Sequence, residues 1–309
     1  MKTARGRLAG WLLALLWLPA CAQTLHPRQQ PNARARAPAE FSHADLDRVL
    51  RRFVDDQGLV DYAGLAREPF VLGTYLGQLA AYSPASHPAL FPREADRLAY
   101  WLNAYNAIVL RLVLEHYPIR SVMDVRTAWW NALLPEGAGF FLGQRFPLGG
   151  RSTSLHALEK RILRTRFADP RIHFALNCPS LGCPRLPRHA FAADRFEEQL
   201  ATETRRFLAE PRNVRVDSAT RTVWLSAIFD GYEDDFRRWQ EQRSRPPTLL
   251  GFVVDEAAPA TADDAARAAA QGFAVRFVDH DWRLNDQALG PRPPGGVSPG
   301  FARPGPAGP

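Results

Sequence analysis

The stretch READRLAYWLNAYNAIVLRLVLEHY, residues 93–117, predicts the longest helix of the chain. Its apolar side chains recur at helical spacing and form a broad face. Pro118 follows directly and ends the helix, because the residue before a proline is pushed out of the helical conformation. The face comprises Leu98, Trp101, Leu102, Tyr105, Ile108, Val109, Leu112 and Val113.

Helices dominate the sequence before this stretch, and short strands are scattered after it. We expect helices over 41–53, with Ser42 as N-cap, and over 72–82. The remaining expected elements are a hairpin strand at 140–148, a helix start at 154–159, a buried strand at 171–177, a helix at 194–208, a hairpin of 214–217 and 222–225, a helix at 229–239, a strand or helix end at 249–254 and a strand at 274–278. Because helices and strands do not alternate, the pattern predicts an α+β fold. Its helical N-terminal half should pack on a small, mainly antiparallel sheet within a single domain.

The N-terminus has the features of an export signal, which we assign to residues 1–20. Lys2, Arg5 and Arg7 precede an apolar run that is too short to span a membrane. Two processing outcomes remain open. Leu-Pro-Ala-Cys at 18–21 resembles a lipobox, which would lipidate Cys21 and anchor an outer-membrane lipoprotein facing the periplasm. Cleavage after Ala22 would instead release a soluble periplasmic or secreted protein.

Composition divides the rest of the chain. Residues 21–39 are polar and proline-rich, and we expect a disordered tether. Residues 40–288 are long enough for a single domain with a substantial core. Residues 289–309 form a Pro/Gly tail that cannot build a core and should be disordered.

The charge balance argues against nucleic acid as a partner. The net charge of +7 falls to +4 once the three basic residues of the signal are removed, and the remaining charges are spread along the chain. The sequence contains no zinc-finger spacing and no concentrated basic helix. It also lacks a glycine-rich phosphate loop, so we expect no nucleotide cofactor. We identify no residues that call for another cofactor.

The segment RIHFALNCPSLGCPRL, residues 171–186, carries the most reactive side chains. Cys178 and Cys183 can close a local disulfide in an oxidising compartment. Alternatively, Cys178 is a nucleophile at the end of a strand, with His173 or His156 as its base. In a regular strand His173 and Cys178 would point to opposite faces, so their pairing requires a turn at Asn177. A metal site is not expected, because the cysteine spacing is loose for zinc and no second pair exists.

Five side chains have both a structural and a functional interpretation. His173 is either a hydrogen-bonded core histidine or a tuned base. His156 and Glu159 share one helix face, as a proton-transfer pair or as a solvated first turn. Asn103, with Asn106 one turn later, either holds neighbouring loops or serves as an oxyanion donor. The structural interpretation is the simpler one in each case.

Seven motifs in order resemble the domain-of-unknown-function 547 family. They are GLVDY at 58–62, YWLNAYN at 100–106, SLHALE at 154–159, HFALNC at 173–178, LSAIF at 225–229, DF at 235–236 and VDHDWRLN at 278–285. The resemblance spans about residues 41–285 and brings no known activity. Two positions depart from the family pattern: Gly231 replaces a usual tryptophan, and His280 replaces a usual tyrosine.

Two functions of different classes remain. The first is a thiol-dependent hydrolase or acyl transferase of the cell envelope, in which Cys178 attacks an acyl carbon and a histidine is the base. Asn103 or Glu159 would orient or stabilise the reacting groups. The second is a non-catalytic envelope binding or assembly module, in which a Cys178–Cys183 disulfide staples a recognition loop. Either would act on a small molecule or a peptide that the residues do not identify.

Overall fold

A buried helix, α4 (Glu94–His116), organises the first half of the molecule. The computed structural model describes residues 23–24, 40–125 and 137–290. Every residue of α4 from 99 to 110 is buried, as expected of a helix surrounded by other elements. It contacts α2 (Tyr62–Arg67), α3 (Phe70–Ala81) and α6 (Leu155–Leu158), and α1 (Ala44–Phe53) packs on α3. These helices and strand β2 (Gln144–Leu148) enclose the larger of the two hydrophobic cores in the described part of the chain.

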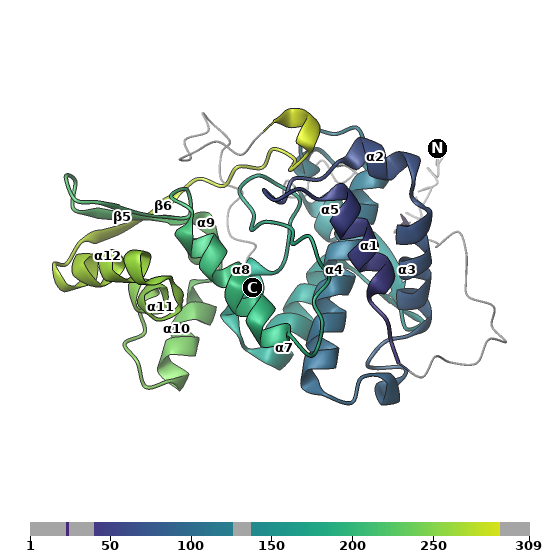
Figure 1. Cartoon of the computed structure of the whole chain (residues 1–309), viewed down its shortest axis with the longest axis horizontal. Coiled ribbons are helices and arrows are strands. Elements are labelled where there is room, and N and C mark those ends of the chain that lie inside the picture. The colour runs from purple at the N-terminus through teal and green to yellow at the C-terminus, as the bar shows by residue number, and fades with distance from the viewer. Residues whose placement is uncertain (1–22, 25–39, 126–136, 291–309) are drawn as a thin grey trace, which may run out of the picture.

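The second half of the chain builds the smaller core. It contains α8 (Phe196–Ala209), α9 (Ala227–Gly231), α10 (Glu233–Gln242), α11 (Leu249–Glu256) and α12 (Pro259–Ala270). Five phenylalanines at its centre contact one another through their rings: Phe174, Phe207, Phe229, Phe236 and Phe252. Figure 1 shows α1–α4 on one side of the molecule, with α8 at the centre. Strands β5 (Thr222–Ser226) and β6 (Ala274–Val278) lie on the other side with α11 and α12.

Among the described residues, two three-stranded sheets accompany the helices, and both are mixed. In the first, β1 (Gln23–Thr24) pairs parallel with β2 (Gln144–Leu148), which pairs antiparallel with β3 (Arg151–Thr153). In the second, β4 (Val214–Asp217) and β5 (Thr222–Ser226) form the expected hairpin, with Val214 opposite Leu225. Strand β6 (Ala274–Val278) adds to β5 in parallel. The α+β class is confirmed, although the strands form two mixed sheets and not one mainly antiparallel sheet.

One segment expected to be a strand is helical, and a second, left open as a strand or a helix end, is a helix; capping explains both. Residues 171–177 were expected to be a buried strand, but Pro170–Phe174 is a 3-10 helix (η5). The Asp169 carboxylate accepts a hydrogen bond from the backbone N–H of Arg171, and Pro170 occupies the first turn, where a proline costs no hydrogen bond. Similarly, Thr248 caps α11, so the apolar run at 249–254 is a helix. The predicted helix at 229–239 divides at Tyr232 into α9 and α10.

The other described elements are short. They are η1 (Pro88–Leu90), η2 (Val122–Asp124), α5 (Ala138–Phe141), the π-helical turn η4 (Glu159–Leu163), α7 (Arg164–Phe167) and η6 (Gln287–Leu289). Across the described ranges, no helix combines the length and the apolar character needed to cross a membrane. The expected export signal, Cys21, residues 25–39 of the tether and residues 291–309 of the tail lie outside the described residues.

Candidate functional site

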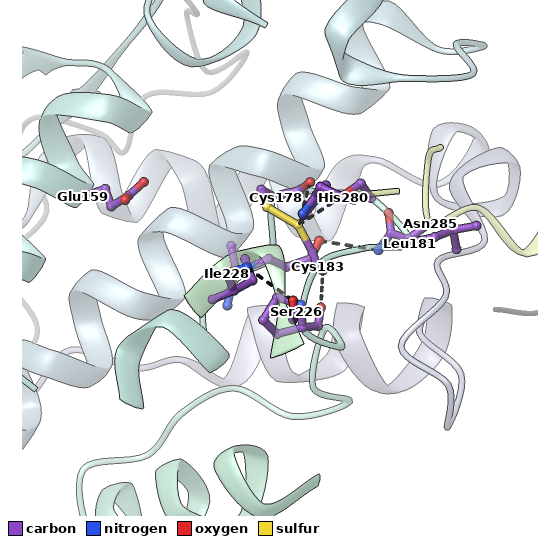
Figure 2. The surroundings of a disulfide bond; sticks show 12 residues. Glu159, Cys178, Leu181, Cys183, Ser226, Ile228, His280 and Asn285 are labelled. Carbon is purple, nitrogen blue, oxygen red and sulfur yellow. Dashed lines mark hydrogen bonds between the residues drawn. A yellow bond between two sulfur atoms is a disulfide. The ribbon is translucent and has the colours of Figure 1, made fainter. Parts of the chain in front are cut away.

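The two cysteines of the folded region form a disulfide. The Cys178 and Cys183 Sγ atoms are 2.05 Å apart, and their Cα atoms are separated by 5.9 Å. The loop between them pairs with the C-terminal segment of the domain: the Leu181 N–H donates to the Arg283 carbonyl at 2.8 Å, and the Gly182 N–H donates to the Asp281 carbonyl at 2.8 Å. The disulfide loop, residues 178–183, therefore has a fixed position on residues 281–284 (Figure 2).

A histidine does lie beside the sulfurs, but it is His280. Its Nε2 atom is 3.7 Å from Cys183 Sγ and 2.9 Å from Ser180 Oγ, and the Ser180 hydroxyl donates to Cys183 Sγ at 3.1 Å. Burial lowers the pKa of His280 to about 4, so the imidazole is neutral near pH 7. One ligand atom from each of Cys178, Cys183 and His280 lies within 4.8 Å of the others, which makes them the residues that could hold a metal once the disulfide is reduced.

His173, a candidate base for Cys178, belongs to a different cluster. Its Nε2 atom is 2.9 Å from Asp235 Oδ2, and its ring stacks on Tyr232 with centroids 3.8 Å apart. Arg164 donates to the same carboxylate at 2.7 and 3.0 Å. Burial alone would raise the pKa of Asp235. The hydrogen bonds from His173 and Arg164, together with the positive charge of Arg164, outweigh it and hold this pKa well below its usual range.

Glu159 extends this cluster on the far side of Tyr232. The Tyr232 hydroxyl donates to Glu159 Oε1 at 2.8 Å, and burial raises the Tyr232 pKa well above its usual value, with Glu159 adding to the rise. Glu159 begins the π-helical turn η4, and such turns are often found at functional sites. His156 is partly buried, and burial lowers its pKa. We call Glu159, Tyr232, His173, Asp235 and Arg164 the tyrosine–histidine cluster. Figure 2 shows Glu159 set apart from the disulfide.

The two asparagines of α4 hold irregular backbone against the helix. Asn103 Nδ2 donates to the Phe191 carbonyl at 2.8 Å, and its Oδ1 accepts from the Phe191 N–H at 2.9 Å. Asn106 uses its two amide ends in the same way, on the Ala175 carbonyl at 3.0 Å and the Asn177 N–H at 3.0 Å. These contacts are the ones expected of the loop-holding role, and both side chains are buried.

A chain of buried polar groups continues from Asn177 and was missed by sequence reasoning. Asn177 Nδ2 donates to the Pro184 carbonyl at 2.9 Å, and its Oδ1 accepts from Asn285 at 3.4 Å. Asn285 Oδ1 in turn accepts from the Tyr62 hydroxyl at 2.9 Å. Together with Asn103, Asn106 and the disulfide, this chain fixes residues 175–195, which we call the anchored segment. Apart from an isolated bridge at Ser180, the anchored segment contains no helix or strand.

The anchored segment borders the concave surface of the molecule. A cavity of about 560 Å³ is lined by Phe41, His43, Phe91, Arg93, Phe191 and Arg195, among others. A second cavity, of about 470 Å³, is lined by residues that include Asp56, Gln57, Arg185, Arg188, His189 and Arg206. Arg51 borders both cavities. Sequence reasoning had no signal for this surface, because its residues come from helices and loops far apart in the chain.

Comparison with known proteins identifies one family. Residues 91–208 match the family described as "Protein of unknown function, DUF547", and this segment includes α4, the disulfide and the anchored segment. Comparison of the chain with curated proteins and with solved structures finds no match in either. The match over residues 91–208 supports the assignment of this segment to the DUF547 family of proteins of unknown function.

Proposed function

We propose that this chain is a non-catalytic binding module of the cell envelope, in which the Cys178–Cys183 disulfide staples a recognition loop. The observation that carries the proposal is the disulfide itself, because its two sulfurs are bonded to each other. A sulfur nucleophile must be a free thiolate, so neither cysteine can attack an acyl carbon in this form. The recognition loop is the anchored segment, residues 175–195.

The other groups of the thiol mechanism are engaged in structural contacts. His173 hydrogen-bonds Asp235 and stacks on Tyr232, and Glu159 accepts from the Tyr232 hydroxyl. Asn103 uses its donor and its acceptor on the backbone of Phe191. A general base must lie within hydrogen-bond reach of the proton that it removes. The histidine nearest to the sulfurs among the described contacts is His280, which lies beside the buried Cys183.

Rigidity of the anchored segment supports a role in recognition. Its backbone is bonded to α4 at Ala175, Asn177 and Phe191, and the disulfide closes it between the first two contacts and the third. A loop that is already ordered loses little conformational entropy when a ligand binds. Because this ordered segment lines both large cavities, ligand contacts would form on a surface that needs little rearrangement.

The charges around the cavities favour a polypeptide of mixed charge as the ligand. The rim carries exposed or partly exposed ion pairs, such as Arg51 with Asp47 and Arg188 with Asp56. Pairs of this kind contribute about 0–1 kcal/mol, so a peptide with acidic and basic side chains can exchange them for its own at little cost. Phe41 is partly exposed at the larger cavity and offers apolar contact area, whereas Phe91 and Phe191 lie buried behind the cavity wall.

Export is the second part of the proposal. Disulfides persist in oxidising compartments such as the bacterial periplasm and are rare in the cytosol. The expected signal at residues 1–20 would deliver the chain there. Lipidation of Cys21 would then hold the module at the outer membrane, facing the periplasm.

The first experiment measures the state of the thiols. The secreted protein is alkylated before and after reduction and analysed by mass spectrometry. We expect Cys178 and Cys183 to be protected from alkylation until a reductant is added. Free thiols, with Cys178 reacting faster and at lower pH than Cys183, would overturn the proposal and restore the thiol-dependent hydrolase or acyl transferase.

The second experiment tests binding at the cavity. A photo-crosslinking amino acid replaces Arg188, which borders the 470 Å³ cavity, or Glu241, an exposed residue of α10 that serves as the control. We expect discrete polypeptide adducts in cells from position 188 only, and their loss when Cys178→Ser and Cys183→Ser are added. Equal labelling from both positions, or adducts that persist without the disulfide, would contradict a stapled recognition loop.

A further inference from the structure

The residues around the disulfide include a group of metal-binding side chains that plays no part in the proposed binding function. Two cysteine sulfurs and one imidazole nitrogen lie together, with one ligand atom of each residue within 4.8 Å of the others. His280 comes from the C-terminal segment, about 100 residues after Cys178. The three residues are therefore brought together by the tertiary fold and are not neighbours in sequence.

The disulfide bond is not the only contact that holds these residues together. Backbone hydrogen bonds from Leu181 to Arg283 and from Gly182 to Asp281 hold the loop beside the His280 segment. The Ser180 hydroxyl, 2.9 Å from His280 Nε2, adds a side-chain contact between the same two segments. When the sulfur–sulfur bond is broken, each cysteine can rotate about χ1 to another staggered rotamer, so the sulfurs can separate without the loss of these contacts around residues 180–182.

We propose that the reduced protein binds one copper(I) ion through Cys178 Sγ, Cys183 Sγ and His280 Nε2. Thiolates are soft ligands and select soft cations such as copper(I). Zinc favours four protein ligands in structural sites, whereas this group, within the part of the chain that the structure describes, contains three. Copper(I) is stable with two or three ligands, so the S₂N set suits it better.

The chemistry balances with an external thiol as reductant. Two thiol molecules reduce the Cys178–Cys183 disulfide to two cysteine thiols and leave as one oxidised disulfide. Binding of copper(I) then displaces one proton from each cysteine thiol to solvent, and His280 contributes the lone pair of Nε2 while Nδ1 carries the ring proton. The Ser180 hydroxyl, 3.1 Å from Cys183 Sγ, can donate to the resulting thiolate. Such outer hydrogen bonds orient and tune metal ligands.

Copper(I) itself is the probe for the test. The full chain carries Cys21→Ser, so that Cys178 and Cys183 are its only thiols, and is purified in mild detergent. Under argon, it is titrated against a copper(I)–bicinchoninate complex, with and without prior reduction by a phosphine that is then removed. We expect one copper(I) per reduced chain and none per oxidised chain, and X-ray absorption should show two sulfurs and one nitrogen.

Variants separate the histidine from the cysteines. Loss of a hydrogen bond that supports a metal ligand lowers metal affinity ~10–100-fold. His280→Gln removes a ligand itself, so it should weaken copper(I) binding by at least that factor. His156→Gln, at a partly buried histidine outside the group, should leave binding unchanged. Equal binding by oxidised and reduced protein, an unchanged affinity in His280→Gln, or zinc binding without copper(I) binding would overturn the proposal. The comparison of oxidised with reduced protein requires no change at His280, so it tests the proposal even if His280→Gln fails to fold.

Discussion

Replacement of Asn103 by alanine tests whether the anchored segment depends on the helix beneath it. The Asn103 side chain is buried on α4 and forms two hydrogen bonds with the backbone of Phe191, at 2.8 and 2.9 Å. In Asn103→Ala both bonds are lost, and the N–H and the carbonyl of Phe191 remain buried without these partners.

The sign of the change in stability separates the contribution of the two hydrogen bonds from that of helix propensity. Each buried polar group left without a partner costs about 1–3 kcal/mol, so the two groups of Phe191 together predict a loss of about 3 kcal/mol in the free energy of unfolding. Helix propensity acts in the opposite direction, because alanine is a better helix former than asparagine by up to about 0.7 kcal/mol. A contact that contributed nothing would therefore make Asn103→Ala more stable than the parent protein.

Urea unfolding followed by tryptophan fluorescence measures this difference. With a slope of about 2 kcal/mol per molar, a loss of about 3 kcal/mol moves the midpoint down by roughly 1.5 M. Hydrogen exchange should accelerate in peptides covering 187–195. Glu94→Gln, at an exposed position of the same helix, should change stability by less than about 0.5 kcal/mol. An unchanged or raised midpoint in Asn103→Ala would refute the reasoning.

Three further changes have expected outcomes. Joint replacement of Cys178 and Cys183 by serine should lower the free energy of unfolding by about 2 kcal/mol in a urea titration, because a loop this short restricts the unfolded chain only modestly. A loss of more than twice that value would show that the disulfide does more than close the loop. Burial lowers the pKa of His43 to about 4, whereas its unfolded pKa is about 6.5, so the unfolded state takes up the proton first as the pH falls. The melting temperature should therefore fall as the pH decreases from 7.5 to 5. His43→Gln should make this fall shallower, and an identical slope would contradict the assignment of the pH dependence to His43. Gly58→Ala should destabilise the protein by more than 1 kcal/mol in thermal unfolding, because φ of Gly58 is +71° and the added Cβ would lie 2.7 Å from Arg185 Cβ. A neutral result would mean that the loop around Arg185 moves freely.

The sequence predicted the elements whose signals are local and periodic. The apolar face of 93–117 gave α4 within one residue at each end, and the turn between Asp217 and Thr222 gave the hairpin. The apolar run after Pro170 was wrong as a strand, because short apolar runs are ambiguous and the Asp169 cap decided the local conformation. Parallel pairing of β5 with β6 crosses about 50 residues and has no local signal.

The candidate site was predicted in its parts but not in its grouping. Cys178 and Cys183 form a disulfide, which was one of the two alternatives predicted for them. The asparagines of α4 hold neighbouring loops, as their structural interpretation predicted. His173 was singled out for its closeness to Cys178 in sequence, yet the structure directs it to Asp235, 62 residues away. His280 is the histidine beside the sulfurs, and only its departure from the family pattern drew attention to it. Sequence distance is a poor guide where a loop and a distant segment pair through their backbones.

The way in which α4 holds the anchored segment has a consequence for how this surface can diverge. Asn103 and Asn106 bind backbone atoms of Phe191, Ala175 and Asn177, and not their side chains. The course of the chain is therefore independent of most of the side chains that it displays. Substitutions at exposed positions such as Arg188 can accumulate without altering that course. A scaffold of this kind lets one backbone path present many different surfaces.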